Sequence, residues 1–484
     1  MTTLPAKVQR REANRRWFSF LRAIGLLIVL GSLNVVVANR VTVSMPAPGE
    51  VSVEAELSSP ARSWSFRNVY AGILGLAERV ENFRAAGAGG QAVEVKKSAT
   101  GEFRSDLDAT KISYTVKLAN PRATDTSHTS WLVSDRGLLM FADLLPQDLE
   151  TLSAEFALPN GWTVESSQAR DAAGRFEVPE PVKAVFLIGT ALRKTTHELD
   201  GMVYDVVISG KWPFKDETAS KAVTQVMQKY LALTGYRLPN RSVVLITLTP
   251  MSMPRFKWGA EARGSTVVLV LDPKELGAWY EQLIIIFTHE ILHLWVPNSL
   301  KLQGDYDWFF EGFTMYIAMC TALELKAIKF NGYLTTVAGA YDAYLANLDT
   351  DNLSLIEASE RRWTTPFPMV NVKGILVAFL LDLITRRESG GKITLASRYR
   401  ELFAGRVADD GDANKAIITL LGSTPATREL LKSYVENSGK IDLERVVPAF
   451  GLMVDPFGRP SNLRVSSGLT PEQKQLLRGL GYRD

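Results

Sequence analysis

Cysteine and histidine are both scarce in this sequence, and neither sign of charge dominates it. The 484 residues include one cysteine, Cys320, so no disulfide can form within the chain. There are 55 Lys and Arg against 52 Asp and Glu, a net charge of +3. Because no basic stripe runs along the body of the chain, we expect no nucleic-acid partner. The composition also leaves the oligomeric state undetermined.

The first 39 residues are predicted to anchor the chain in a membrane. Residues 1–16 form a basic leader with a single acid, Glu12, and a mostly apolar stretch follows over 17–39. This order is typical of a targeting or anchoring segment whose basic side stays in the cytoplasm. The stretch is long enough to span about 30 Å of hydrocarbon, but Val36 to Ala38 would also suit a signal cleavage site. We expect a single-pass anchor, with cleavage as the alternative; both place residues 40–484 on the extracytoplasmic, periplasmic side.

Two structural units are expected beyond the anchor, in an α+β arrangement. Over residues 40–212, short stretches of alternating apolar and polar residues predict a β-rich, sandwich-like domain. Residues 111–118 and 152–159 show this alternation most clearly, whereas 66–83 fits a helix and a strand equally well.

Helices dominate the pattern from residue 213 to about 440. The first is expected over 216–235, where apolar residues recur at helical spacing and Gly235 ends the run. Two strands interrupt the helices, over 242–249 and 266–272. The remaining residues, 441–484, form a tail with one short helix capped by Thr470.

The strongest chemical signal is the sequence His-Glu-x-x-His at residues 289–293. Helical spacing places His289 and His293 on one face, about 6 Å apart, where both can reach a single Zn²⁺. Glu290 projects beside them and can take a proton from a water molecule. The neighbouring positions are Ile and Leu, and polar groups buried among them need a partner. The other two histidines, His128 and His197, have polar neighbours and are expected to be exposed in loops.

A catalytic zinc needs a third protein ligand and an open fourth position. Glu311 is the candidate, because it is the one acid within the run WFFEGF at 308–313, on a second helix that can pack against the first. The alternative for Glu311 is a carboxylate stabilised by the N-terminus of its helix.

The stretches THEILHLW (288–295) and WFFEGFT (308–314) resemble the gluzincin zinc metallopeptidases, and most of all the glycyl aminopeptidase family, relatives of aminopeptidase N. The resemblance implies a thermolysin-like domain over 213–440. It also implies that His289, His293 and Glu311 bind one zinc ion and that Glu290 is the general base. Members of this family often carry a C-terminal PDZ domain, and we expect none in the short tail.

Two further segments can be aligned with that family. The stretch WGAEARGS (258–265) is similar to a Gly-Gly-Leu-Glu-His strand, so Gly259 and Glu261 match positions that line the substrate cleft. The resemblance implies that Glu261 accepts the substrate's α-ammonium, since a free N-terminus needs an anion. The alternative for Glu261 is a turn carboxylate paired with Arg263.

The second segment begins at Asn371, where the family has the tyrosine of a Tyr-x-Lys-Gly sequence. That hydroxyl is understood to bind the developing oxyanion, and an asparagine amide is also a donor. Asn371 is therefore the expected oxyanion donor. Tyr333, Tyr341 and Tyr344 are the alternative sources of a hydroxyl.

These features predict a membrane-anchored zinc metallopeptidase that hydrolyses peptide N-termini outside the cytoplasm. The expected partners are a peptide substrate and the membrane. One rival hypothesis is a catalytically inactive zinc domain that binds a peptide or a membrane partner, which the loss of the family tyrosine favours. Another is a hydrolase for a non-peptide substrate that uses the same metal chemistry.

Overall fold

The computed structural model describes residues 38–118, 126–250, 258–275, 277, 280–347, 353–362, 369–405, 411–455 and 461–483. The predicted leader and nearly all of the predicted anchor fall outside these ranges, so the anchor stays a prediction. Within the described ranges, no helix combines the length and the apolar character needed to cross a membrane.

Two β-sheets form the β-rich part, and they share one hydrophobic core. The larger sheet has nine strands in the order β13-β14-β11-β1-β2-β8-β5-β6, with β7 paired to β8, and the smaller has the order β12-β15-β10-β9. Inward residues such as Val53 of the larger sheet and Phe186 of the smaller sheet belong to this common core. The expectation of a β-rich N-terminal part is therefore confirmed. The strands are β1 Asn39–Ala47, β2 Glu50–Ser65, β5 Val80–Ala86, β6 Ala92–Val93, β7 Lys96–Ala99, β8 Glu102–Lys117, β9 Trp131–Leu132, β10 Arg136–Met140, β11 Leu152–Ala157, β12 Trp162–Glu165, β13 Ala169–Arg170, β14 Phe176–Val178 and β15 Val185–Thr190.

Short elements complete the β-rich part. The segment 66–83, whose sequence fits a helix and a strand equally well, contains the two-stranded hairpin β3–β4, a single 3-10 turn and the start of β5. These elements are β3 Val69–Tyr70, β4 Ile73–Leu74, η1 Leu76–Arg79, α2 Phe141–Leu144 and η2 Pro181–Lys183.

A third sheet lies beneath the helices and has the strand order β16-β17-β18-β20-β19. Its middle strands β17, β18 and β20 run parallel, and antiparallel strands flank them. Because β16 and β17 precede residue 213, this sheet crosses the point where the sequence pattern changes. Its elements are β16 Arg193–Leu199, β17 Met202–Ile208, β18 Ser242–Leu248, β19 Trp258–Arg263, β20 Thr266–Leu271, η3 Pro273–Glu275 and the helix α3 Asp216–Thr234, which ends at the left-handed Gly235 as predicted.

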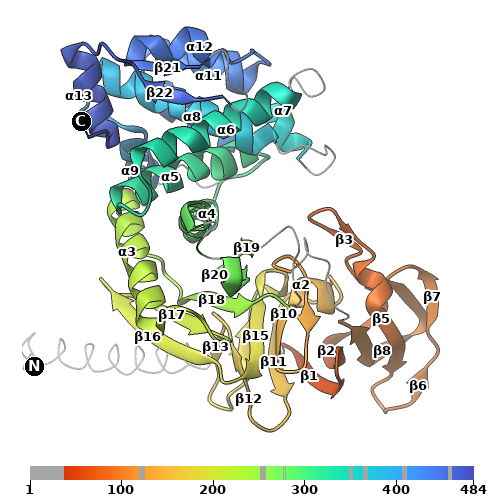
Figure 1. The fold of residues 1–484 in the computed structure, drawn as a ribbon. Helices are drawn as coiled ribbons and strands as arrows, with labels where there is room; N and C mark the ends of the chain where they lie inside the picture. Colours follow the sequence, from red (N-terminus) through yellow and green to blue (C-terminus); the bar gives the residue numbers. More distant parts are fainter. Residues whose placement is uncertain are drawn as a thin grey trace, which may run out of the picture.

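Helices make up the other half of the molecule, and α4 lies between them and the third sheet (Figure 1). A single core joins these helices, the sheet and the C-terminal tail. The elements are α4 Tyr280–Leu292, η4 Trp308–Phe313, α5 Thr314–Glu324, α6 Phe330–Asn347, α7 Leu355–Glu360, α8 Met369–Glu388, α9 Leu395–Ala404, α10 Ala413–Leu421, α11 Pro425–Leu431, η5 Lys432–Glu436, α12 Leu443–Val446, η6 Val447–Phe450, β21 Leu452–Val454, β22 Leu463–Val465 and α13 Pro471–Leu480. Thr470 caps α13 through a hydrogen bond from the Gln473 backbone, as the sequence predicted.

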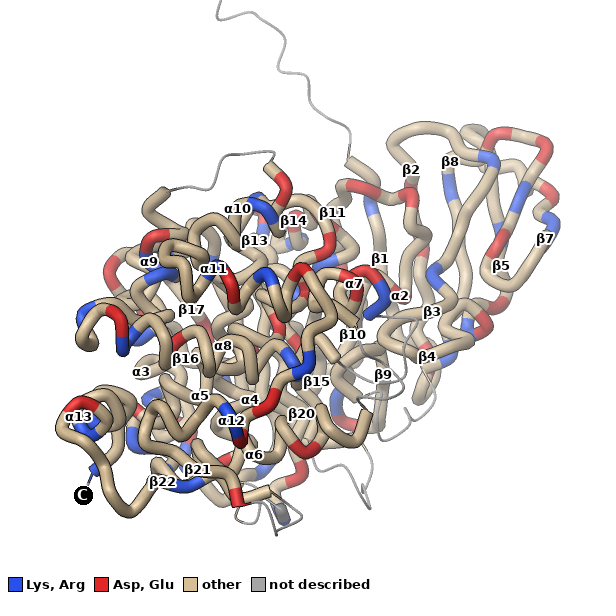
Figure 2. The backbone as a smooth tube through the Cα atoms, turned by 90° about the horizontal axis from the view of Figure 1, so that it is seen from above, with Lys and Arg blue, Asp and Glu red and all other residues tan. Residues whose placement is uncertain are grey.

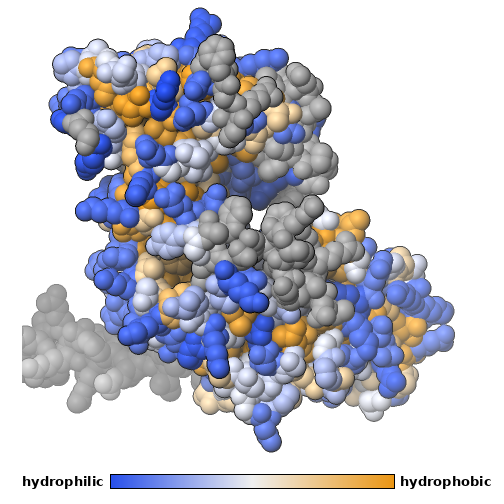
Figure 3. All heavy atoms as spheres, viewed as in Figure 1, coloured by the Kyte–Doolittle hydropathy of each residue, from blue (hydrophilic) through white to orange (hydrophobic). Residues whose placement is uncertain are grey.

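The outer surface carries both signs of charge. Over the described part of the chain, Lys and Arg are interspersed with Asp and Glu across the molecule in the view of Figure 2, without a large region of one sign. On the face shown in Figure 3, the surface is hollowed between the helical half and the β-rich half. The helix α4 therefore lies close to the junction at which a substrate could enter.

The position of η4 depends on a close backbone contact with α8. A Cβ added to Gly312 would lie 2.5 Å from the Gly374 Cα and 2.6 Å from the Val370 carbonyl oxygen. A Cβ added to Gly374 would in turn lie 2.8 Å from the Gly312 Cα. Only glycine at both positions lets the two backbones approach this closely. This contact fixes the segment that carries Glu311.

We predict that Gly312→Ala destabilises the protein, because the new methyl group has no space in the contact with α8. Overpacking of this kind typically lowers the free energy of unfolding by about 1–3 kcal/mol. The control is Gly339→Ala on α6, where a Cβ meets nothing within 4 Å, so the better helix propensity of alanine should raise stability slightly. Thermal unfolding would measure both variants, and equal midpoints would contradict the close contact.

Candidate metal centre

His289 and His293 face each other at the end of α4. Both side chains are buried, and their Nε2 atoms lie 3.0 Å apart. His293 follows the last helical residue, but its backbone N–H still donates to the His289 carbonyl at 3.3 Å. The helical spacing inferred from the sequence therefore holds for both rings.

The second nitrogen of each ring is engaged by an oxygen. The Nδ1 of His293 lies 2.8 Å from the Val296 carbonyl oxygen. The Nδ1 of His289 lies 3.4 Å from the Thr314 hydroxyl. A hydrogen bond from Nδ1 selects the tautomer whose Nε2 has a free lone pair, as in metal-binding histidines. Both imidazoles are thus oriented with Nε2 toward a common point.

Glu311 brings a carboxylate to the same point from η4, a π-helical segment. Its Oε2 lies 3.4 Å from the His289 Nε2, and its Oε1 lies 4.0 Å from the His293 Nε2. The three ligand atoms all fall within 4.8 Å of one another. Two imidazoles and one carboxylate are the donor set of many catalytic zinc sites. The residues present therefore fit a zinc ion, and His289, His293 and Glu311 form a possible metal-binding group.

Glu290 is buried next to this group. Burial raises the pKa of its carboxyl to about 7, and the negative charges of Glu311 and Glu261 add to this, although His289 opposes it. A carboxyl with a pKa near neutrality can both accept and release a proton at physiological pH. This is the property required of the general base that the sequence assigned to Glu290.

Two donors hold the carboxylate of Glu311. Arg362 donates from Nη2 to Oε1 at 2.9 Å, and Asn371 donates from Nδ2 to Oε2 at 3.3 Å. Arg362 is itself positioned by Asp307, whose Oδ1 it contacts at 2.5 Å. Burial opposes ionisation of Glu311, but the hydrogen bond to His289 and the charges of His293 and Arg362 keep its pKa well below the usual range. Sequence reasoning did not identify Arg362.

Asn371, the expected oxyanion donor, therefore donates one amide N–H to Glu311 in this structure. The alternative hydroxyls lie elsewhere. Tyr333 donates to Tyr316 at 3.2 Å within the helical core. Tyr344 accepts from the Ile441 backbone at 3.1 Å, and Tyr341 bonds the backbone at Leu443. These three hydroxyls all serve the helical core and the tail.

Glu261 lies on β19 with a set of partners that we call the Glu261 cluster: Tyr70, His128, Glu261 and Arg263. Its oxygens receive Tyr70 Oη at 2.6 Å, His128 Nδ1 at 2.7 Å and Arg263 Nη2 at 2.8 Å. Burial opposes ionisation, but Arg263, His128 and Tyr70 lower the pKa of Glu261 to about 2. Glu261 raises the pKa of Glu290 and His128 lowers it. The strand β19, which carries Glu261, packs against α4, so the cluster belongs to the surroundings of the metal-binding group.

His128 lies in a turn, as expected for a loop histidine, but the expected exposure is wrong. It is half-buried and paired with Glu261, because the segment 126–128 comes down onto β19 at Gly259. A Cβ on Gly259 would lie 2.8 Å from the Ser127 Oγ and 3.0 Å from the Thr126 Oγ1, so a larger residue would require these side chains to shift. His197 is on strand β16 rather than in a loop, and its ring stacks on Tyr204 at 5.2 Å between centroids.

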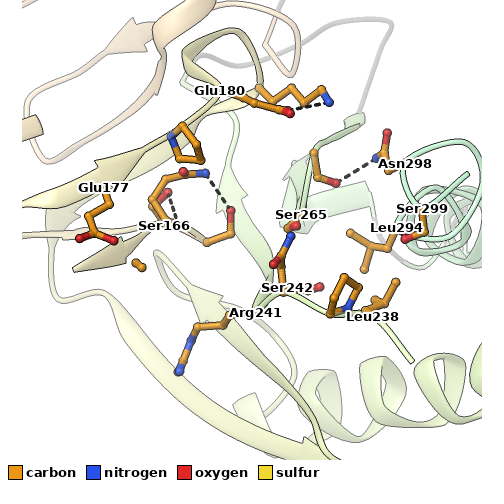
Figure 4. Close-up of a pocket in the computed structure, with 18 of the residues that line it drawn as sticks. Ser166, Glu177, Glu180, Leu238, Arg241, Ser242, Ser265, Leu294, Asn298 and Ser299 are labelled. Carbon is orange, nitrogen blue, oxygen red and sulfur yellow. Dashed lines mark hydrogen bonds and ion pairs between the residues drawn. The ribbon is translucent and has the colours of Figure 1, made fainter. Parts of the chain in front are cut away.

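A separate cavity of about 840 Å³ opens at the junction of the β-rich part and the third sheet. Figure 4 shows Ser166, Glu177 and Glu180 on one side of it, and Leu238, Arg241, Ser242, Ser265, Leu294, Asn298 and Ser299 on the other. Neither the metal-binding group nor Glu290 lines this cavity. Its position therefore does not bear on the chemistry of the metal centre.

Comparisons with known proteins extend these findings to the fold. No family model and no curated protein matches the sequence. Among solved structures, an aminopeptidase N family protein from Idiomarina loihiensis superposes with a TM-score of 0.74 at 18% identity, over 86% of this chain and 79% of that one. An M1 zinc metallopeptidase from Deinococcus radiodurans gives a TM-score of 0.52 at 15% identity, over 84% of this chain and 95% of that one. The chain therefore has the fold of the aminopeptidase N-like M1 zinc metallopeptidases.

Proposed function

We propose that this protein is a zinc-dependent peptidase with its active centre at His289, His293, Glu311 and Glu290. The observation that carries the proposal is the convergence of three ligand atoms within 4.8 Å beside a buried carboxyl whose pKa lies near neutrality. The fold of known zinc metallopeptidases supports it. The resemblance of 288–314 extends the proposal to the glycyl aminopeptidase branch and to peptide N-termini.

The chain's own residues would divide the work of peptide hydrolysis. A zinc ion held by His289, His293 and Glu311 would supply Lewis-acid activation of a carbonyl group and of a water molecule. Glu290 would accept the proton of the attacking water and deliver it to the leaving amine. Arg362 and Asn371 would keep the Glu311 carboxylate in place, since partners of metal ligands fix their orientation.

We predict that the purified protein binds one zinc ion per chain and hydrolyses peptides, and that two substitutions separate these properties. Glu290→Gln should retain zinc and lose turnover by roughly 10²–10⁴-fold, the usual contribution of a general base. Glu311→Ala should lose zinc, because it removes a ligand. Zinc content and turnover of a peptide panel are the measurements. Glu281→Gln makes the same substitution at an exposed position of α4 and should change neither.

Two results would contradict this assignment. Full zinc affinity in Glu311→Ala would remove Glu311 from the ligand set. A wild-type protein that binds one zinc ion but turns over no faster than Glu290→Gln would favour the rival function, a zinc domain that binds a peptide or membrane partner without cleaving it. The bond between Asn371 and Glu311 favours that rival, because it uses one of the two N–H donors of the amide expected to stabilise an oxyanion.

The role of Asn371 has its own test. If its amide positions Glu311, Asn371→Leu should weaken zinc binding by about 10–100-fold, the usual effect of losing a partner of a metal ligand. Arg362→Leu should act in the same direction, because it releases the other oxygen of Glu311. If Asn371 instead binds an oxyanion, turnover at saturating zinc should fall by about 10²–10³-fold while zinc affinity stays unchanged. Competition with a chelator of known affinity would measure zinc binding.

The proposal includes a single-pass anchor that places residues 40–484 in the periplasm, and it rests on the sequence of residues 1–39 alone. We predict that a reporter fused after the last residue, Asp484, is active if it requires export and silent if it works only in the cytoplasm. Replacing the basic residues of the leader with acidic ones should weaken this orientation. Activity of the cytoplasmic reporter in the unaltered fusion would overturn the topology.

A further inference from the structure

The carboxylate of Glu261 has little capacity left for a substrate. Arg263 donates to its Oε1 from Nε at 3.0 Å and from Nη2 at 2.8 Å, and the Tyr70 hydroxyl donates to the same atom at 2.6 Å. His128 is 2.7 Å from Oε2, and because an ionised carboxylate only accepts, His128 must be the donor. A carboxylate offers about four lone-pair sites, two on each oxygen. Three of the hydrogen bonds end on Oε1, which has no site left, and one ends on Oε2.

Burial makes this arrangement hard to exchange. The side chains of Glu261 and Arg263 are 9% and 8% exposed. Removing Arg263 from Glu261 to admit another cation would leave a guanidinium buried without its counter-charge, which is strongly destabilising. An incoming cation therefore cannot simply displace it.

Among the described residues, the charge beside the Glu261 cluster is positive rather than negative. Arg67 joins Arg263 beside the Tyr70 ring, with guanidinium carbons 5.2 Å and 4.5 Å from its centroid. Two guanidinium groups thus lie beside the Tyr70 ring, whose hydroxyl donates to Glu261. The negative charge of the nearby Asp143 does not neutralise these guanidinium groups, because Asp143 is already paired with Arg79 at 2.6 Å. A further positive charge placed here would meet repulsion.

The cluster is also close enough to the reacting centre to matter for substrate recognition. The strand β19 packs against α4, and the His128 side chain remains 33% exposed beside it. A peptide with its scissile bond at Glu290 would therefore bring one of its neighbouring backbone groups against the Glu261 cluster.

We infer that the Glu261 cluster excludes a free α-ammonium and selects peptides whose nitrogen at this position is acylated, as in a blocked N-terminus or an interior peptide bond. The inference rests on the proposed peptidase function and changes its substrate class. Glu261 acts as the internal counter-ion of Arg263, and the subsite accepts a neutral amide, which adds no charge.

A matched pair of ligands tests this inference. Tyr-Ser-Ala, the substrate bound in one of the related solved structures, and its N-acetyl form differ only in the charge and acylation of the terminal nitrogen. Calorimetry with zinc-loaded Glu290→Gln would measure binding, and wild-type turnover with product identification would measure cleavage. The acetylated peptide should be preferred by on the order of tenfold or more in both assays, because like charges in a recognition site are strongly unfavourable.

Variants of the cluster separate charge from hydrogen bonding. Arg263→Met should shift the preference toward the free peptide by on the order of tenfold, because it exposes the Glu261 charge. Tyr70→Phe removes a donor without changing any charge, and it should leave the ratio nearly unaltered. His128→Leu, at a partly exposed position, should also shift the preference toward the free peptide, as Arg263→Met does. If Arg263→Met does not fold, His128→Leu provides the test.

The outcomes distinguish the two proposals. Tighter binding and faster cleavage of the free peptide would overturn the inference and leave the peptidase function standing. A preference for binding the acetylated peptide, without turnover of either, would support the inference and refute the peptidase function. Failure of both peptides to bind the zinc-loaded protein would overturn the inference.

Discussion

An ionised carboxylate is stable in a protein interior only when donors surround it, and this requirement shapes the whole centre. Glu311 and Glu261 are both largely buried, and both have a lowered pKa. For Glu311 the partners are two imidazoles, the Arg362 guanidinium and the Asn371 amide. The two imidazoles come from the end of α4, the Asn371 amide comes from α8 and the Arg362 guanidinium comes from the segment after α7, so the fold must be complete before the charge is stable.

The third carboxyl, Glu290, is the exception that gives the centre its chemistry. Burial raises its pKa to about 7, the charges of Glu311 and Glu261 add to the rise, and the charges of His289 and His128 offset it only in part. Of three buried glutamates, Glu311 and Glu261 are thus kept ionised, while Glu290 has a pKa near neutrality, because their neighbours differ. This separation is the usual way in which a protein assigns the roles of ligand and base to chemically identical side chains.

The sequence revealed those parts of the centre that are local in the chain. The pair His289 and His293 could be predicted from helical spacing, and Glu311 from its isolation among aromatic residues. Strand and helix patterns likewise predicted most of the β-rich part and the helix α3. The sequence could not reveal Arg362 or Tyr70, because each reaches its carboxylate from a distant segment. It misjudged the exposure of His128 for the same reason: polar neighbours indicated exposure, while the carboxylate that pairs with it, Glu261, lies far along the chain.

Asn371 shows how a correct position can be given an incomplete role. The resemblance aligned it with a tyrosine whose long side chain reaches past the metal ligands, and the alignment does place it at the centre. The shorter amide ends at Glu311 instead, 3.3 Å from Oε2. The close contact of Gly312 with Gly374 holds η4 and α8 so near to each other that the amide meets the carboxylate first. The backbone approach, rather than the chemistry of the amide, therefore determines which group it can serve.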